Sequence, residues 1–126
     1  MENLKDKILN MDFARNVWAN KRLSRLCPGN NIARFKEVLE IEDTEKQFDA
    51  MEDIILVMHE AWEVQMKFSG SEYEPLEVTK MQLDMLDEDE LLGLIQRALA
   101  VFDKDGEITV EAEPKKGKKK EATKSS

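Results

Sequence analysis

The sequence predicts an all-α protein, a small helical bundle built around one long central helix and followed by a disordered basic C-terminal tail. Apolar residues recur at spacings of three and four over residues 45–68, as they do along one face of a helix. Glycine and proline are scarce, five and three among 126 residues, which disfavours a turn-rich β protein. The charge is unevenly distributed along the chain. Residues 1–113 hold 26 acidic and 13 basic side chains, a net charge of −13, whereas residues 114–126 hold six lysines and one glutamate, a net charge of +5.

These patterns divide the chain into three parts. Residues 1–106 are expected to form one helical domain. Residues 107–113 alternate apolar and polar side chains and are expected to be extended or strand-like, although one strand cannot build a sheet. Residues 114–126 are rich in lysine, glycine and serine, with no apolar residue larger than Ala122, and are expected to be a disordered tail.

The central helix is expected over residues 45–68, about six turns. Thr44 followed by Gln47 matches a capping box at its start. The sequence Ser69-Gly70-Ser71 is expected to end it. One side of the helix carries Phe48, Met51, Ile55, Met58, Trp62 and Met66.

Two further helices are expected after it. Thr79 and Gln82 fit a capping box at the start of a short helix over residues 80–86, whose apolar surface is Met81, Leu83, Met85 and Leu86. Asp87 with Glu90 marks the start of a helix over residues 88–102, and a turn is expected at 103–106. One interpretation of Gly93, which lowers helix propensity, is a close approach between helices.

The N-terminal third is less regular. A helix is expected over residues 12–27, ending at Cys27-Pro28-Gly29-Asn30, because proline and glycine interrupt helices. A second is expected over residues 31–40, and residues 1–10 are expected to be a short helix or a frayed end.

Catalytic and metal sites find little support in the sequence. The chain has one histidine and one cysteine, so a closed zinc site cannot be built from nitrogen and sulfur ligands. His59 is expected at the boundary of the core, and Cys27 is interpreted as a small apolar residue. Glycine-rich phosphate loops and dinucleotide fingerprints are absent from the sequence. The chain is therefore expected to be neither an enzyme nor a cofactor-binding protein.

Composition also bears on partners and compartment. An acidic body does not release counterions from a nucleic-acid backbone, so nucleic-acid binding is not expected. The longest apolar run, Ile54–Met58, is too short to span a bilayer, and the N-terminus lacks an apolar leader segment. A cytoplasmic protein is expected, and its oligomeric state stays open, a homo-oligomer included.

A partner-binding surface is the functional hypothesis that the residues themselves offer. Three of the seven methionines lie on the central helix, and methionine-rich surfaces adapt to varied partners. The candidate contact residues are Phe48, Met51, Ile55, Met58, Trp62 and Met66. Ordinary core filling by the same residues is the alternative.

Four segments together resemble one known family. They are the stretch 51–62, the loop Tyr73-Glu-Pro-Leu76, the acid-capped helix start 87–92 and the Glu-Pro-Lys-Lys-Gly-Lys-Lys-Lys run that ends at Lys120. Over roughly residues 45–120 the chain is similar to tail assembly chaperones of long-tailed, non-contractile phages. The resemblance implies a chaperone that binds the tape measure protein, keeps it soluble and helps to recruit tail tube protein. It also implies a gene that ends near a slippery site, a longer frameshifted product, and action in the host cytoplasm rather than in the mature virion.

Two other classes stay open. An acidic inhibitor, acting by DNA mimicry or protein binding, is consistent with the charge of the body, although the basic tail would oppose DNA mimicry. A plain oligomeric structural protein without a client is the other.

Overall fold

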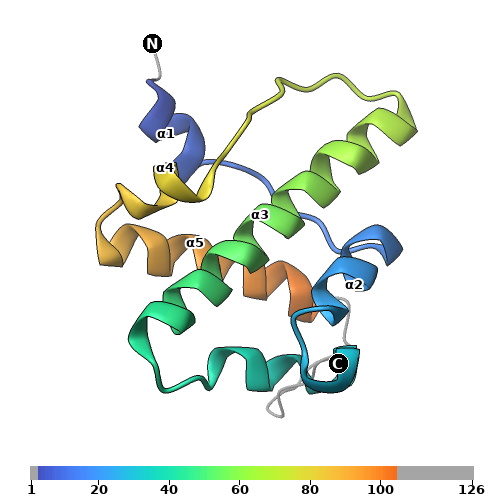
Figure 1. Cartoon of the computed structure of the whole chain (residues 1–126). Helices are drawn as coiled ribbons and strands as arrows, with labels where there is room; N and C mark the ends of the chain where they lie inside the picture. The colour runs from blue at the N-terminus through green and yellow to red at the C-terminus, as the bar shows by residue number, and fades with distance from the viewer. Residues whose placement is uncertain (1–2, 105–126) are drawn as a thin grey trace.

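A computed structural model describes residues 3–104 of the chain, except for the side chain of Lys104. Its regular elements are all helical, which confirms the predicted fold class (Figure 1). They are the α-helices α1 (Leu4–Leu9), α2 (Val17–Ser24), α3 (Thr44–Ser69), α4 (Lys80–Asp84) and α5 (Glu88–Lys104), and the 3-10 helices η1 (Pro28–Asn30) and η2 (Ile32–Leu39). The expected extended segment 107–113 and the expected tail 114–126 lie outside the described residues.

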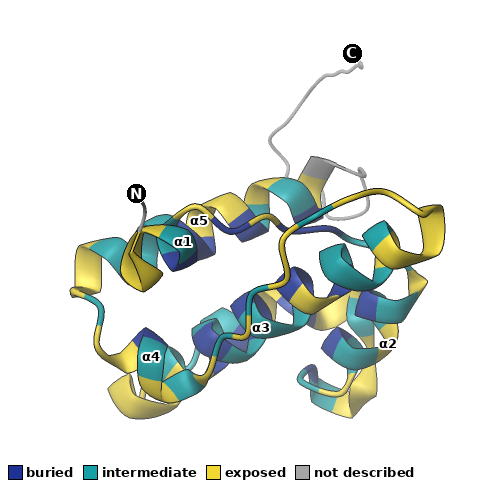
Figure 2. Ribbon diagram, turned by 90° about the horizontal axis from the view of Figure 1, so that it is seen from above, coloured by how far each residue is buried: buried dark blue, intermediate teal, exposed yellow. Residues whose placement is uncertain are grey.

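Helix α3 is the central element, as predicted. It packs against α2, α4, α5 and η2 (Figures 1 and 2). Its buried residues are Ala50, Glu52, Ile54, Ile55, Met58, His59 and Ala61. At 100° per residue, these seven residues cover roughly half of the circumference of α3. The buried face is therefore wider than a single row of residues spaced three and four apart.

The ends of the helices follow local capping chemistry, with one correction. The Thr79–Gln82 capping box at α4 is complete, as predicted. At α3, however, the N-cap is Asp43 rather than Thr44, and its carboxylate accepts a hydrogen bond from the backbone N–H of Lys46. Asp and Thr both cap well, and here Gln47 instead donates to the carbonyl of Leu39, which holds η2 against α3.

The predicted helix over residues 12–27 is wrong in its first part. Residues 11–16 are not helical, and α2 begins only at Val17, capped by the Asn16 side chain. In this segment Met11 and Phe13 are both buried, the spacing of an extended chain. The segment runs along α3, where the N–H of Ala14 donates to the carbonyl of Met58.

The predicted helix over residues 31–40 exists as the 3-10 helix η2. Its apolar residues Ile32, Phe35 and Val38 are three apart, and residues three apart share one side of a 3-10 helix. The Phe35 ring stacks on Phe102 near the end of α5, with ring centroids 4.1 Å apart. Helix α5 continues through Lys104, so the predicted turn is wrong at residues 103–104, and residues 105–106 lie outside the described part.

Gly93 does not mark a close approach of helices. A Cβ atom added there would meet no atom within 4 Å. Gly70, by contrast, ends α3 in the left-handed region at φ 73°, where only glycine is unstrained.

These two glycines give an opposed pair of predictions. Gly93→Ala is expected to raise the free energy of unfolding by about 0.5–1 kcal/mol, since alanine favours the helix and fits without contact. Gly70→Ala is expected to lower it by about 1 kcal/mol, because a Cβ is strained in the left-handed region. Urea titration of both variants measures the two changes, and a destabilised Gly93→Ala variant would contradict the open environment at Gly93.

Candidate partner-binding surface

The structure separates the six residues that the sequence offered as one contact surface. The side chains of Ile55 and Met58 have no exposed area and belong to the core. Phe48, Met51, Trp62 and Met66 are half-buried. Since α3 is covered by four elements, its apolar face is core rather than an open surface, and Ile55 and Met58 are not accessible to a partner in this fold.

The chain after Gly70 turns back toward α4 (Figure 1) and is tied to α3 on the way. The N–H of Leu76 donates to the Glu63 carboxylate over 2.8 Å. Further along, the Lys80 ammonium lies 3.1 Å from an Asp53 oxygen, which fixes the start of α4 against α3. These contacts place α4 beside the first half of the central helix.

Helix α4 then presents apolar side chains on opposite sides. Leu83 is buried, whereas Met81 and Met85 are 72% and 75% exposed. Met85 also lines an apolar groove of about 200 Å³ with Leu4, which is 49% exposed and comes from α1. The sequence indicated the apolar residues of this helix, but not which of them face outward, because that depends on where α4 docks. We call Leu4, Met81 and Met85 the methionine surface.

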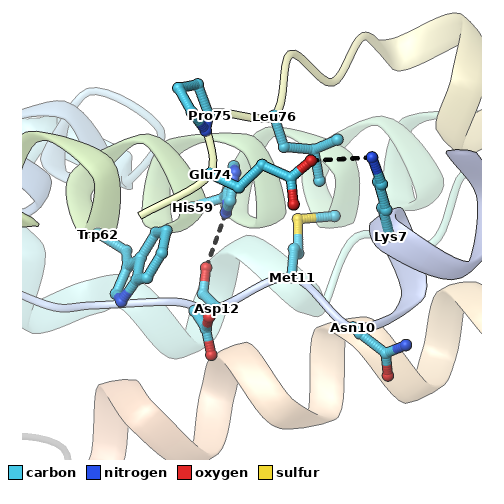
Figure 3. A pocket seen from close by; sticks show the side chains of 9 residues that line it. All are labelled: Lys7, Asn10, Met11, Asp12, His59, Trp62, Glu74, Pro75 and Leu76. Atoms are coloured by element: carbon cyan, nitrogen blue, oxygen red, sulfur yellow. Dashed lines mark hydrogen bonds and ion pairs between the residues drawn. The ribbon is translucent and has the colours of Figure 1, made fainter. Parts of the chain in front are cut away.

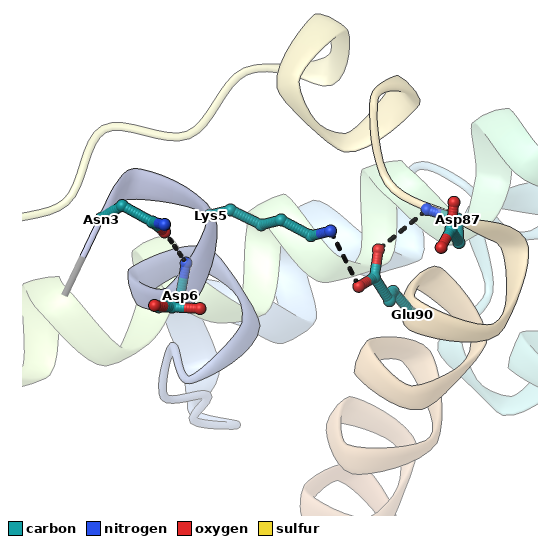
Figure 4. A network of polar contacts seen from close by, with 5 residues as sticks. All are labelled: Asn3, Lys5, Asp6, Asp87 and Glu90. Carbon is teal, nitrogen blue, oxygen red and sulfur yellow. Dashed lines mark hydrogen bonds and ion pairs between the residues drawn. The ribbon is translucent and has the colours of Figure 1, made fainter.

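Helix α1 lines this apolar groove opposite α4 and is held in place by polar contacts with the start of α5 (Figure 4). The Lys5 ammonium lies 3.0 Å from a Glu90 oxygen, and the other Glu90 oxygen accepts the backbone N–H of Asp87. This N–H to Glu90 bond is one of the two reciprocal bonds of the predicted Asp87–Glu90 capping box. The Asn3 side chain caps α1 by accepting the N–H of Asp6. Leu4 is therefore carried on an anchored helix.

On the other side of α4, a second, larger groove of about 670 Å³ lies between α3, α4 and the start of α5. Glu52 lines this groove, although its side chain is only 1% exposed, and its Oε1 atom has no hydrogen-bond partner. Burial, followed by a hydrogen bond to the Asp84 carboxylate, raises the pKa of Glu52 to about 8. Lys80 acts in the opposite direction. A carboxyl group held near neutrality in this way can exchange a proton close to physiological pH.

His59 lines a third site, a pocket of about 180 Å³ that the half-buried Trp62 also lines (Figure 3). The sequence placed His59 at the core boundary, and in the structure it lies at the edge of the buried face of α3 with its side chain 5% exposed. Its Nδ1 atom lies 2.8 Å from the backbone carbonyl oxygen of Asp12, and its ring stacks on Trp62. The imidazole therefore connects α3 to the extended segment 11–16, which is a structural task.

Cys27, the N-cap residue of η1, does not line any of the three sites described above. Its thiol is buried and donates to the carbonyl of Leu23 over 3.3 Å, and burial raises the pKa of the thiol. Thiolate formation is thereby disfavoured. Within residues 3–104, no group of three His, Cys, Asp or Glu side chains is arranged to hold a metal ion.

The raised pKa of Glu52 predicts a pH dependence of stability. In the unfolded chain Glu52 loses its proton near pH 4.5, but in the folded chain only near pH 8. The folded state therefore holds more protons between these values, and stability falls as pH rises, by up to about 1.4 kcal/mol per pH unit. Glu52→Gln, which keeps a donor for Asp84 and cannot ionise, is expected to be more stable than wild type at pH 8 and about equal to it at pH 4.5.

Chemical denaturation from pH 4.5 to pH 8.5 measures this difference. Glu60→Gln is the matched control, since Glu60 is exposed on the same helix and should show the wild-type slope. If wild type and Glu52→Gln lose stability in parallel, Glu52 does not carry the raised pKa.

Comparisons of the chain with protein-family models, with characterised proteins and with solved structures found no match. None of the helices in residues 3–104 has the length and apolarity to span a bilayer. What the chain does is therefore inferred from its own surfaces, chiefly the methionine surface and the Glu52 groove, which is the largest of the three grooves and pockets described above.

Proposed function

We propose that this protein is a chaperone for a helical client, of the kind that binds a phage tape measure protein before tail assembly. The observation that carries the proposal is the methionine surface. Leu4 and Met85 line one apolar groove and are 49% and 75% exposed, and Met81, four residues before Met85, is 72% exposed. The resemblance of residues 45–120 to tail assembly chaperones supplies the identity of the client.

The side chains of this surface suit a helical client. Met81 lies in α4 and Met85 is its C-cap residue, so the two side chains, four residues apart, are neighbours. Methionine is unbranched and polarizable, and can repack against different apolar side chains. A helix that lays an apolar stripe on Leu4, Met81 and Met85 would use the helix-in-groove mode of recognition.

The charge of the chain suits the same task. Residues 1–113 carry a balance of −13, and a strongly acidic exterior keeps many copies on one client from associating with each other. In this proposal the protein acts in the host cytoplasm, hands the tape measure protein on to tail tube subunits, and is not retained in the virion.

Co-expression with a tape measure protein tests the proposal. We expect the soluble fraction of the client to rise with the wild-type chain and to fall back with the double variant Met81→Gln/Met85→Gln. Glutamine keeps length and helix propensity, and loss of two apolar contacts should weaken binding by roughly tenfold or more.

Phe68→Gln is the matched control. Phe68 is 93% exposed on the last turn of α3, outside the methionine surface, and its replacement should leave the client soluble. A client that is equally insoluble with and without the wild-type chain would overturn the proposed function. Equal rescue by the double variant would remove the methionine surface from it.

The gene offers a second, independent check. Lysine codons are A-rich, and six lysines fall within residues 115–124. We expect codons 114–121 to contain an A-rich slippery heptamer with an overlapping reading frame. Sequencing the locus decides this, and an isolated gene without an overlapping frame would count against the tail assembly proposal.

A further inference from the structure

The groove lined by Glu52 combines an apolar floor with an excess of carboxylates. It lies where the first half of α3, the short helix α4 and the start of α5 meet, an end of the molecule visible in Figure 1. Its apolar lining is Phe48, Leu83, Leu86 and Leu91, and its acidic lining is Glu45, Asp49, Glu52, Asp84 and Glu88. None of the side chains that line it in the described part of the chain is basic. We call it the acidic groove.

Glu52 supplies a second observation that points to a ligand. It is almost fully buried, yet Oε1 accepts no hydrogen bond, and an unsatisfied buried oxygen costs about 1–3 kcal/mol. Lys80, the cation that acts on its pKa, lies 3.1 Å from Asp53 and 3.8 Å from Asp49. Other carboxylates thus share this cation, and the buried oxygen is left without a donor.

We propose that the acidic groove binds one face of an amphipathic helix from another protein, a face on which a lysine or arginine stands among apolar residues. The apolar residues would lie on Phe48 and Leu86, the half-buried members of the apolar lining, and the cation would donate to Glu52 and Asp84. The inference rests on the proposed function, since it takes the partner to be helical, and it adds the chemical class of the helix that is recognised. The acidic groove and the methionine surface adjoin, because Leu86 lines the grooves on both sides of α4.

Two other occupants fit less well. A bare metal ion would need three ligating side chains, and no such group is found in residues 3–104. The lysine-rich segment 114–126 of the chain matches the charge, but it has no apolar residue larger than Ala122 to cover the floor. An organic cation on an apolar face satisfies both halves of the groove.

Binding of such a cation would displace a proton. Glu52 faces Asp49 on its own helix and Lys80 and Asp84 on α4, while Glu45 and Glu88 complete the charged lining from α3 and α5. With a pKa of about 8 the empty site holds its proton near pH 7. A cation beside it favours the carboxylate, so the proton passes to the buffer as the helix binds.

The test uses the full chain and two synthetic helical peptides as probes. Both peptides carry the same leucine and alanine stripe, one with a single lysine within the stripe and the other with glutamine in its place. We expect the lysine peptide to bind wild type at least about tenfold more tightly, the usual effect of a charge-assisted hydrogen bond. In Glu52→Gln the preference should shrink to within about twofold, and the control Glu60→Gln should keep it.

Calorimetry at pH 7 in two buffers of different ionisation enthalpy provides the second readout. Wild type should release up to one proton per lysine peptide bound, and Glu52→Gln should release none. Asp84→Asn, at an exposed position, should weaken the preference without unfolding the chain, and circular dichroism checks the fold of every variant.

The outcomes are distinguishable. If both peptides bind wild type equally, or if the preference survives in Glu52→Gln, the acidic groove does not select a cation and only this inference fails. If neither peptide binds, the proposed recognition of helices fails with it. If a peptide of residues 107–126 binds better than the lysine peptide, the occupant is the chain's own C-terminal segment, and the inference is overturned.

Discussion

The burial of α3 is the constraint on which the rest of the structure depends. Its buried side chains cover roughly half of the helix circumference, too much for any single neighbour to shield. Segments from both ends of the chain are therefore drawn onto it: α2 and residues 11–16 from one side of the sequence, α4 and α5 from the other. Elements on both sides of α3 in the sequence pack on this one helix, whatever their order along the chain.

The edge of the buried face of α3 carries two polar residues, Glu52 and His59, whose polar neighbours differ. Glu52 and His59 are seven residues apart and so lie on nearly the same side of α3. The Nδ1 atom of His59 meets the carbonyl of Asp12, a partner supplied by the extended segment, while its buried Nε2 atom has no hydrogen-bond partner and lies 3.4 Å from a Glu63 oxygen. Glu52 is beside the carboxylate of Asp84, which raises its pKa, and its Oε1 atom has no hydrogen-bond partner. A conflict of this kind, maintained in the core of a small protein, is more typical of a binding site than of a stabilising contact.

The short helix α4 is the element on which both proposed binding surfaces depend. Leu83 fixes it to the core, so its other apolar residues must face outward or into the grooves on either side. On the α1 side the lining is apolar and includes Met85, and on the α5 side it is acidic around Leu86. A client helix laid across α4 would meet an adaptable apolar surface and a charged site within one footprint. In the function proposed above, that combination would allow broad recognition of apolar stripes together with selection for a cation in one position.

The sequence by itself determined the helices whose signals are local. The periodicity of residues 45–68, the Thr79–Gln82 capping box and the scarcity of glycine and proline all act between residues close in the chain, and the all-α fold follows from them. Tertiary structure decided the rest. Residues 11–16 are extended because they cover α3, the six predicted contact residues are divided because four elements pack on that helix, and Met81 and Met85 are exposed because Leu83 takes the buried side of α4. Burial depends on contacts between residues far apart in sequence, so neither the outward face of α4 nor the unpartnered oxygen of Glu52 could be read from spacing alone.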